Sequence, residues 1–350
     1  MPAHGAGLAG PPSSMENTMR SCVIVLLLLS TVGAAQIARG QAEAKTPQTF
    51  TESDKAGPDY AIQGEYEGDT ADHAKLGAQV TAQGSGKFAV AILPGGLPGA
   101  GWDGKQKVAG TAETKDGKTS FSGEQLSGEI AADRMSGKLP DGRPFTLNHV
   151  LRESPTRGAR PPEGAIVLFD GSSAAQWNNG KLVDGNLLST LGDPRGITSK
   201  RNFGDIKKLH VEFRLPFMPY ARGQSRSNSG VYLADRYEVQ VLDSFGLKGE
   251  SNECGGIYSL TAPSVNMCFP PLSWQTYDIE FTAPRFGAAG KKTANARMTV
   301  LHNGVKIHDD VEVKQTTVGA EAGEAATGPI QLQNHGNPVY YRHIWVVPGN

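Results

Sequence analysis

The sequence predicts an all-β protein, in which a small β-meander domain precedes a larger antiparallel jelly-roll sandwich. Short runs of alternating apolar and polar residues recur along the chain, and a period of two is that of a strand with one buried face. Turn-forming residues separate these runs, with 44 glycines and 22 prolines among the 350 residues. Long runs with helical periodicity are few. Together these observations favour sheets over helices.

The bulk composition argues against nucleic acid or an anionic membrane as a partner. The formal net charge is -1, so the chain carries no basic field that would attract either one. Apolar residues make up 38% of the sequence, which is adequate for a packed core.

Residues 1–44 are predicted to be an export signal with an upstream extension. Arg20 precedes the apolar run CVIVLLLLSTVGAA, which is short for a membrane-spanning helix, and small residues follow it. This pattern predicts a secretory signal cleaved between Ala35 and Ala44, with Met19 as a candidate start and an uncleaved anchor as the alternative. The mature protein is then expected in the periplasm or outside the cell, without stable insertion in a membrane.

A polar linker and a small β-rich domain follow the signal. Residues 45–59 are rich in Thr, Glu, Lys and Gln, which is typical of a linker. Residues 60–151 alternate around turn signals, which predicts a meander that forms a small sandwich or an open barrel. The turn signals are Gly84-Ser85-Gly86, Asp116-Gly117 and Asp141-Gly142. A Pro- and charge-rich segment, residues 152–164, is predicted to link this domain to the next.

The larger domain spans residues 165–350 and has the clearest strand signals. In KLHVEFRLPF, Val211 and Phe213 share one face, whereas Glu212 lies on the other and is expected to face solvent. Asn303-Gly304 is the strongest hairpin signal in the chain. Clean alternation with short loops predicts two antiparallel sheets around one core, which is a jelly-roll sandwich.

Two cysteines remain once the predicted signal, which contains Cys22, is removed. In an oxidising compartment Cys254 and Cys268 are predicted to form a disulfide, with two unpaired thiols as the alternative. Closing this loop would stabilise the fold by about 3 kcal/mol in the chain-entropy model. Two cysteines without a CxxC motif make a poor zinc site.

The stretch SNSGVYLADRYEVQVLDS, residues 227–244, contains the polar side chains that best suggest a site. Alternation places Glu238 and Gln240 on one face of a strand, and Tyr232 on the polar face of the preceding run. Jelly-roll glycosidases that use double displacement carry acids at positions i, i+2 and i+4 of one strand, and their two catalytic carboxylates lie close together. Here Leu242 stands at the third position. Double displacement is therefore not expected from this strand.

Segments of the larger domain resemble the 3-keto-disaccharide hydrolase family, formerly a domain of unknown function, which is common in exported proteins of planctomycetes and Bacteroidetes. The resemblance covers about residues 165–347 and rests on LFDG with Trp177, NSGVYL, YEVQVLDS, GGIY, PPLSWQTYDIEFTAPRF, VLHNGVKIHDD and GPIQLQNHGNPVYYRHIWV, in that order. It implies a concanavalin-like jelly roll and activity on 3-keto-glycosides. One position departs from the family pattern Gln-Asp-His-Gly, because Asn334 precedes His335 here. An Asn can replace an acid that only orients His335 through a hydrogen bond.

The chemistry that this resemblance implies needs a base, an acid and an electropositive group. A ketone at C3 acidifies the C2 proton, and its loss lets the oxygen at C1 leave by β-elimination before water adds. The predicted catalytic residues are Glu238, as general base or metal ligand, and His335, as general acid or ligand. A divalent metal ion is one way to hold the ketone oxygen, although no cofactor is certain from the sequence. The predicted substrate-binding residues are Arg226, Tyr232, Gln240, Tyr258, Gln333 and Asn334.

Within this set, Arg226 or Tyr258 is expected to polarise the ketone or to hold a hydroxyl, and the amides are expected to bind sugar hydroxyls. The predicted function is therefore an exported enzyme that cleaves the glycosidic bond of 3-keto-glycosides. The alternative is a non-catalytic concanavalin-like carbohydrate-binding protein. A conventional glycosidase and a structural cell-surface protein also remain open.

Overall fold

A computed structural model describes residues 48–131 and 133–349 of the chain. The predicted signal segment, residues 1–44, lies outside these described residues. So do residues 45–47, which begin the predicted linker of residues 45–59. None of the helices in the described ranges has the length and apolar character needed to cross a membrane. The described residues all belong to one unit by their internal contacts.

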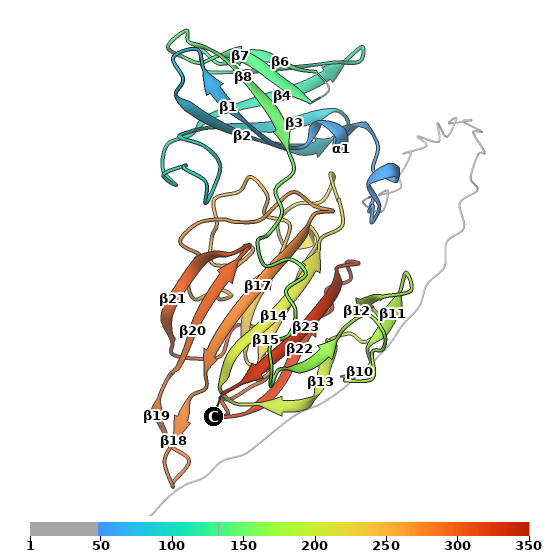
Figure 1. Ribbon diagram of the computed structural model, residues 1–350, viewed down its shortest axis with the longest axis vertical. Coiled ribbons are helices and arrows are strands. Elements are labelled where there is room, and N and C mark those ends of the chain that lie inside the picture. Colours follow the sequence, from blue (N-terminus) through green and yellow to red (C-terminus); the bar gives the residue numbers. More distant parts are fainter. Residues whose placement is uncertain (1–47, 132, 350) are drawn as a thin grey trace, which may run out of the picture. The chain divides into compact units, whose positions relative to one another are not determined.

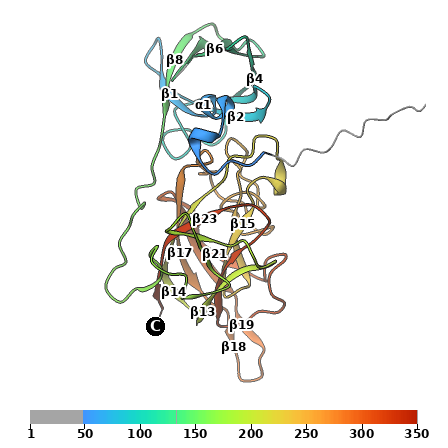
Figure 2. The ribbon, with the colours of Figure 1, turned by 90° about the vertical axis from the view of Figure 1, so that its right-hand side faces the viewer.

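Eight antiparallel strands of the smaller domain follow one another around a closed barrel. They are β1 (Gly64–Thr70), β2 (Lys75–Gly84), β3 (Lys87–Pro94), β4 (Val108–Lys115), β5 (Lys118–Gly123), β6 (Ser127–Ala131), β7 (Arg134–Lys138) and β8 (Pro144–Val150). Pairing of β1 with β8 closes the ring, which Figure 2 shows from one end. The predicted meander is confirmed, and its closure removes both exposed sheet edges.

The turns of the barrel follow from their sequences. Asp116 and Gly117 both have positive φ, of 50° and 76°, as a two-residue turn of type I′ requires. Inside the barrel, alternate residues such as Val80, Val90 and Leu147 form an apolar core. Part of the predicted linker is regular structure, with a 3-10 helix η1 (Ser53–Lys55) and a helix α1 (Pro58–Ile62).

The larger domain is a sandwich of two antiparallel sheets (Figure 1). The five-stranded sheet has the order β10 (Trp177–Asn178), β13 (Gly196–Phe203), β22 (Gly328–Gln333), β15 (Ser229–Leu233) and β16 (Tyr237–Val241). The eight-stranded sheet contains β11 (Lys181–Val183), β12 (Leu187–Ser189), β23 (Tyr340–Pro348), β14 (Ile206–Arg214), β17 (Trp274–Thr282), β20 (Ala296–His302) and β21 (Val305–Val313), with β9 (Ile166–Phe169) beside β23. A separate hairpin joins β18 (Arg285–Phe286) and β19 (Lys292–Ala294). The fold class predicted from the sequence is therefore confirmed.

The apolar residues of both sheets meet in one core between them. Val231 and Val239 of the five-stranded sheet and Val211 and Ile279 of the eight-stranded sheet belong to this core and are fully buried. Because side chains alternate along a strand, each sheet turns its intervening polar residues outward. For the five-stranded sheet this outer face carries the predicted site residues Tyr232, Glu238 and Gln240.

Part of the outer face of the eight-stranded sheet is covered, and the expectation that Glu212 faces solvent was wrong. Glu212 is 0% exposed, because the segment of residues 152–164 packs across this face. The backbone N–H of Gly158 donates to Glu212, and the Trp345 indole donates to the carbonyl of Ala159 at 3.0 Å. The linker between the domains therefore acts as a cover for polar groups that alternation alone would place in water.

Cys254 and Cys268 are buried free thiols here, rather than the predicted disulfide. Their side chains lie close enough to hydrogen-bond to each other, and the Cys254 thiol also contacts the Tyr277 hydroxyl at 3.2 Å. The two sulfur atoms therefore already lie together inside the sandwich. Their oxidation to a disulfide stays a prediction.

Candidate functional site

A row of polar residues crosses the outer face of the five-stranded sheet from one edge to the other. The strand register pairs Asn178 with Thr198, Thr198 with Gln331, Gln331 with Tyr232, and Tyr232 with Glu238. Directly paired residues on one face of a sheet lie close enough for their side chains to touch. The row, which we call the polar row, therefore brings together residues from positions 178 to 331.

A second row beside the polar row contains two glycines. Gly196 pairs with Gln333, and Gly230 pairs with Gln240. A side chain added at Gly230 would collide with the carboxyl group of Glu238 and with the ring of Tyr232. Glu238 therefore leans over Gly230, and the absence of a side chain there is what lets it do so.

Glu238 has the electrostatic character of an acid–base group. It is 2% exposed, and burial raises the pKa of its carboxyl group to about 8, while a hydrogen bond from Tyr232 opposes the rise. A buried carboxyl group in this range exchanges a proton near neutral pH, which is common at catalytic sites and rare on a solvated strand face.

Tyr232 connects Glu238 to the neighbouring strand β22. Its hydroxyl accepts a hydrogen bond from Nε2 of Gln333 at 3.0 Å and bonds to the Glu238 carboxyl group. Burial first, and the nearby Glu238 charge second, raise the pKa of Tyr232, so the phenol keeps its proton. Tyr258 lies close to this pair: its N–H donates to the carbonyl of Glu238 at 3.1 Å, and it interacts electrostatically with Tyr232.

Gln240 lies on the predicted face but its side chain is already occupied. Its Nε2 donates to Oε1 of Gln224 at 3.0 Å, and its Oε1 accepts from the backbone N–H of Val241 at 2.9 Å. Gln224 belongs to the 3-10 helix η2 (Gly223–Ser225), which covers Gln240. The residue therefore supports the strand from beneath η2 rather than presenting its amide to a sugar.

Asn334 closes the turn that follows β22. Its Nδ2 donates to the carbonyl of Asp193 at 2.7 Å, and its Oδ1 accepts from the N–H of Gly336 at 2.8 Å. An ionised Asp, which can only accept, could not make the first of these bonds. Asn334 therefore has a role that an acid could not fill, and it holds the turn rather than bonding to His335. His335 itself is exposed in this turn.

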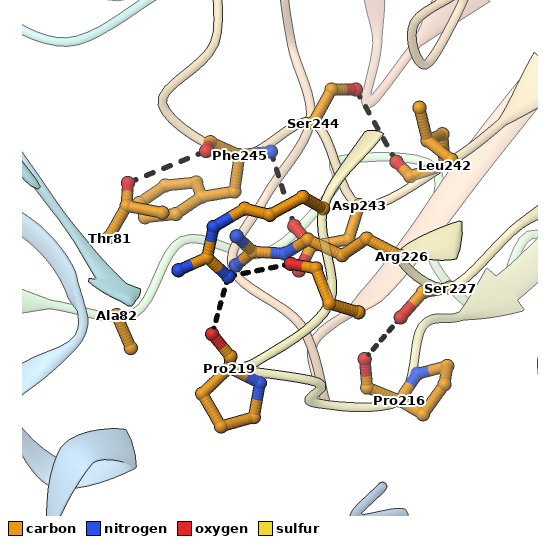
Figure 3. A network of polar contacts seen from close by, with 12 residues as sticks. Thr81, Ala82, Pro216, Pro219, Arg226, Ser227, Leu242, Asp243, Ser244 and Phe245 are labelled. Atoms are coloured by element: carbon orange, nitrogen blue, oxygen red, sulfur yellow. Dashed lines mark hydrogen bonds and ion pairs between the residues drawn. The ribbon is translucent and has the colours of Figure 1, made fainter. Parts of the chain in front are cut away.

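Arg226 is not part of the polar row, in contrast to its predicted role. It is 5% exposed, and its Nε donates to Oδ2 of Asp243 at 2.6 Å. Asp243 also accepts from the backbone N–H of Phe245. Figure 3 shows Arg226 and Asp243 joined side by side, with Ser227 turned toward Pro216. A guanidinium that is already paired and buried is unavailable to a ketone.

Arg195 is a charged residue near the polar row that the sequence analysis missed. Its carbonyl accepts from Nε2 of Gln331 at 2.8 Å, and its guanidinium lies close enough to Tyr232 to interact with it electrostatically. Glu321 and Asp235 hold the side chain at 2.9 and 3.6 Å, and 57% of it is exposed. Only the turn sequence before β13 marks this position, so the fold was needed to find it.

The site offers one carboxylate and no metal cage. Within the two rows, all of whose residues are described, Glu238 is the single acid. Across the described ranges, no three His, Cys, Asp or Glu side chains gather in a way that could hold a metal ion. The chemistry that this face can do therefore centres on one proton-exchanging carboxyl group, phenols, amides and an arginine.

Comparison with known proteins gives a family for the larger domain. Residues 164–347 match the 3-keto-alpha-glucoside-1,2-lyase-like domain. A crystal structure at 2.13 Å of a candidate glycosyl hydrolase from Parabacteroides distasonis ATCC 8503 is 31% identical, with a TM-score of 0.48, over 54% of this chain and 85% of that one. A second such structure, at 1.70 Å and from the same organism, is 16% identical, with a TM-score of 0.37, over 57% and 99%. No curated protein matches the chain.

Proposed function

Because the chain belongs to the 3-keto-alpha-glucoside-1,2-lyase-like domain family, we propose that it cleaves the glycosidic bond of 3-keto-glucosides. The reaction begins with removal of the C2 proton, continues with β-elimination of the oxygen at C1, and ends with addition of water. The observation that carries this proposal is the buried Glu238 carboxyl group, whose pKa is raised to about 8 on the polar face of the five-stranded sheet.

Glu238 is the proposed base. A carboxylate with a raised pKa is a stronger base than an ordinary one, and a proton beside a ketone demands such a base. Its proton affinity is also low enough to release the proton again near neutral pH. Burial supplies this property, and the neighbouring Tyr232 fixes the direction of the carboxyl group.

Arg195 is the proposed electropositive partner of the ketone oxygen, in the role that the sequence analysis gave to Arg226. Abstraction of the C2 proton places negative charge on the oxygen at C3, and a fixed cation nearby stabilises it. Part of the guanidinium remains available, because 57% of the side chain is exposed despite its pairs with Glu321 and Asp235. Tyr258 is proposed to contact a sugar hydroxyl.

The departing oxygen at C1 needs a proton, and His335 remains the proposed donor. It lies in the exposed turn that Asn334 closes at the end of β22. An imidazole is the side chain that enzymes use most often to pass a proton to a leaving group. The elimination thus combines a buried base with an exposed acid.

A single carboxylate disfavours ordinary glycoside hydrolysis at this site. Retaining and inverting glycosidases generally need two carboxyl groups on opposite sides of the bond, whereas Glu238 is alone in the two rows. The elimination needs only one carboxylate, because the ketone supplies the driving force for the first step.

The deciding experiment offers purified protein 3-keto-trehalose and 3-keto-glucosides, with nitrophenyl glucoside as the unoxidised control, each with and without chelator. Release of sugar from the keto substrates by the native protein, and its loss in Glu238→Gln, is the expected result. Cleavage of nitrophenyl glucoside would overturn the requirement for a ketone. Binding of keto substrates without turnover would favour the alternative of a carbohydrate-binding protein.

A further inference from the structure

We propose that Gln333 and Tyr232 are positioning residues that form a reversible hydrogen-bond chain ending on Glu238. In one direction the chain donates to the Glu238 carboxylate, and in the other it accepts from the Glu238 carboxylic acid. This inference rests on the proposed function of Glu238 as the base. It gives the two neighbours a part in the reaction that is separate from touching the sugar.

The hydrogen atoms of the chain can be counted. Nε2 of Gln333 donates to the Tyr232 hydroxyl oxygen at 3.0 Å, so that contact uses a lone pair of the phenol and leaves its one hydrogen free. The same hydroxyl is bonded to Glu238. The phenol hydrogen therefore points to the carboxylate, and the order of donation is Gln333 to Tyr232 to Glu238.

The chain reverses once Glu238 takes up a proton. The carboxylic acid then donates to the Tyr232 oxygen, the hydroxyl hydrogen rotates toward Gln333, and the amide turns by half a turn to present its oxygen. An amide is the side chain suited to this role, because it offers a donor and an acceptor in the same place. Within the three side chains no bond to carbon changes. The C2–H bond of the substrate breaks, its electron pair stays with the substrate, and its proton is the only one that the chain gains, at Glu238.

The unsatisfied oxygen of Gln333 supports such a reversal. In the donor orientation its buried Oε1 has no hydrogen-bond partner. In the reversed orientation a buried N–H group would lack one instead. Each orientation leaves one polar group unsatisfied, so neither holds the amide firmly against the other. The preferred orientation of the Gln333 amide can therefore follow the charge on Glu238. A base that takes up and releases a proton in each turnover needs such a neighbour.

The test measures the protonation of Glu238 directly, without substrate. Protein labelled with carbon-13 at the Glu carboxyl carbons is titrated by NMR, and the Glu238→Gln variant assigns the resonance. Tyr232→Phe removes the donor to the carboxylate, so the midpoint should move upward by on the order of one pH unit. Gln333→Leu weakens the donation from Tyr232, so its midpoint should move the same way by a few tenths of a unit.

Gln240→Met is the matched control, because Gln240 has an amide on the same face that bonds to Gln224 and not to Tyr232. Its midpoint should stay at the native value. An unchanged midpoint in Gln333→Leu, or one that moves no further than in the control, would overturn the chain. If Tyr232→Phe does not fold, Gln333→Leu still decides the question. Because no turnover is measured, a native protein inactive on keto-glucosides with the expected shifts would reject the proposed function alone.

Discussion

The carboxyl group of Glu238 occupies the space that a side chain at Gly230 would need. Gly230 lies in β15 opposite Gln240 of β16, and its backbone conformation is one that any residue can adopt. The glycine is therefore required for the space above it and not for its flexibility. A substitution at Gly230 can therefore move the Glu238 carboxyl group without replacing it.

Gly230→Ala should remove activity while preserving the fold. The added methyl group would displace Glu238 from Tyr232, and a catalytic group misplaced by about 1 Å can lose 100-fold in rate. The measurement is kcat/KM on a 3-keto-glucoside together with the melting temperature. Gly287→Ala is the matched control, since a side chain there meets only ordinary contacts. Full activity in Gly230→Ala would show that the placement of Glu238 over Gly230 does not matter.

Glu238→Gln should change how stability and activity depend on pH. The pKa of Glu238 is raised from 4.5 to about 8 in the folded protein. The folded state therefore holds the proton more tightly than the unfolded state, and the stabilisation is complete below pH 4.5 and lost as the pH rises through 8. Across that window the group lowers the free energy of unfolding by about 1.4 kcal/mol per pH unit.

Urea unfolding at pH 5, 7 and 9 should thus show the native protein losing stability relative to Glu238→Gln. Activity of the native protein should rise over the same window, because ionisation creates the base, whereas the variant should be slower by on the order of 1,000-fold. Parallel stability curves for the two proteins would contradict the raised pKa.

Alternation along single strands predicted part of this site. A period of two correctly placed Glu238, Gln240 and Tyr232 on one face, because the opposite residues are apolar and fill the core. The same rule misplaced Glu212, since nothing in the period of a strand reveals that a distant linker will cover its polar face. Burial by a partner segment is a property of the fold and not of the strand.

The remainder of the site depends on strand order. Strand β22 enters the sheet between β13 and β15, which brings Gln333 into contact with Tyr232 across 101 positions of the chain. Sequence spacing carries no signal for such a neighbour. Arg195 was missed for the same reason, and Arg226 was chosen because it precedes the right strand, although its side chain turns to Asp243.

Arg226 and Arg195 should respond to substitution in opposite ways. Arg226→Leu would leave the buried Asp243 carboxylate without its cation, at a cost of about 3–5 kcal/mol of stability. Arg195→Gln breaks an exposed pair with Glu321 and a longer pair, at 3.6 Å, with the mostly buried Asp235. Together they are worth about 1 kcal/mol, but the substitution should lower kcat/KM by on the order of 100-fold. Unfolding curves and kinetics on both variants provide the comparison. Loss of stability in Arg195→Gln with unchanged kinetics would remove Arg195 from the reaction.

Cys254 and Cys268 should pair when the protein folds under oxidising conditions. Both thiols are buried, so oxidation must occur during folding, where two thiols pass two electrons and two protons to a disulfide donor such as oxidised glutathione. The closed loop should add about 3 kcal/mol of stability. Alkylation in denaturant followed by mass measurement, with Cys254→Ala/Cys268→Ala as the control, reports the pairing. Alkylation of both thiols without a reductant would reject it.

Glu212→Gln should destabilise the sandwich at neutral pH and much less in acid. Burial alone would raise the pKa of Glu212, but the His210 ring at 3.7 Å and hydrogen bonds from the Gly158 backbone and Arg342 outweigh it and lower the pKa from 4.5 to about 2. The ionised form is thus favoured in the folded state, and its contribution is complete above pH 4.5 and disappears as the pH falls through 2. A shift of this size corresponds to about 3 kcal/mol.

Thermal or urea unfolding between pH 7 and pH 2.5 tests this difference. Glu280→Gln is the matched control, because Glu280 lies on the neighbouring strand β17 and is exposed, so its curve should follow that of the native protein. The gap between the native protein and Glu212→Gln should narrow below pH 4.5, because acid then neutralises the native carboxylate as the substitution already has. A stability difference that stays constant into acid would contradict the prediction. The amide would then destabilise the protein through its different hydrogen-bonding groups, and the charge of Glu212 would not hold the linker on the sheet.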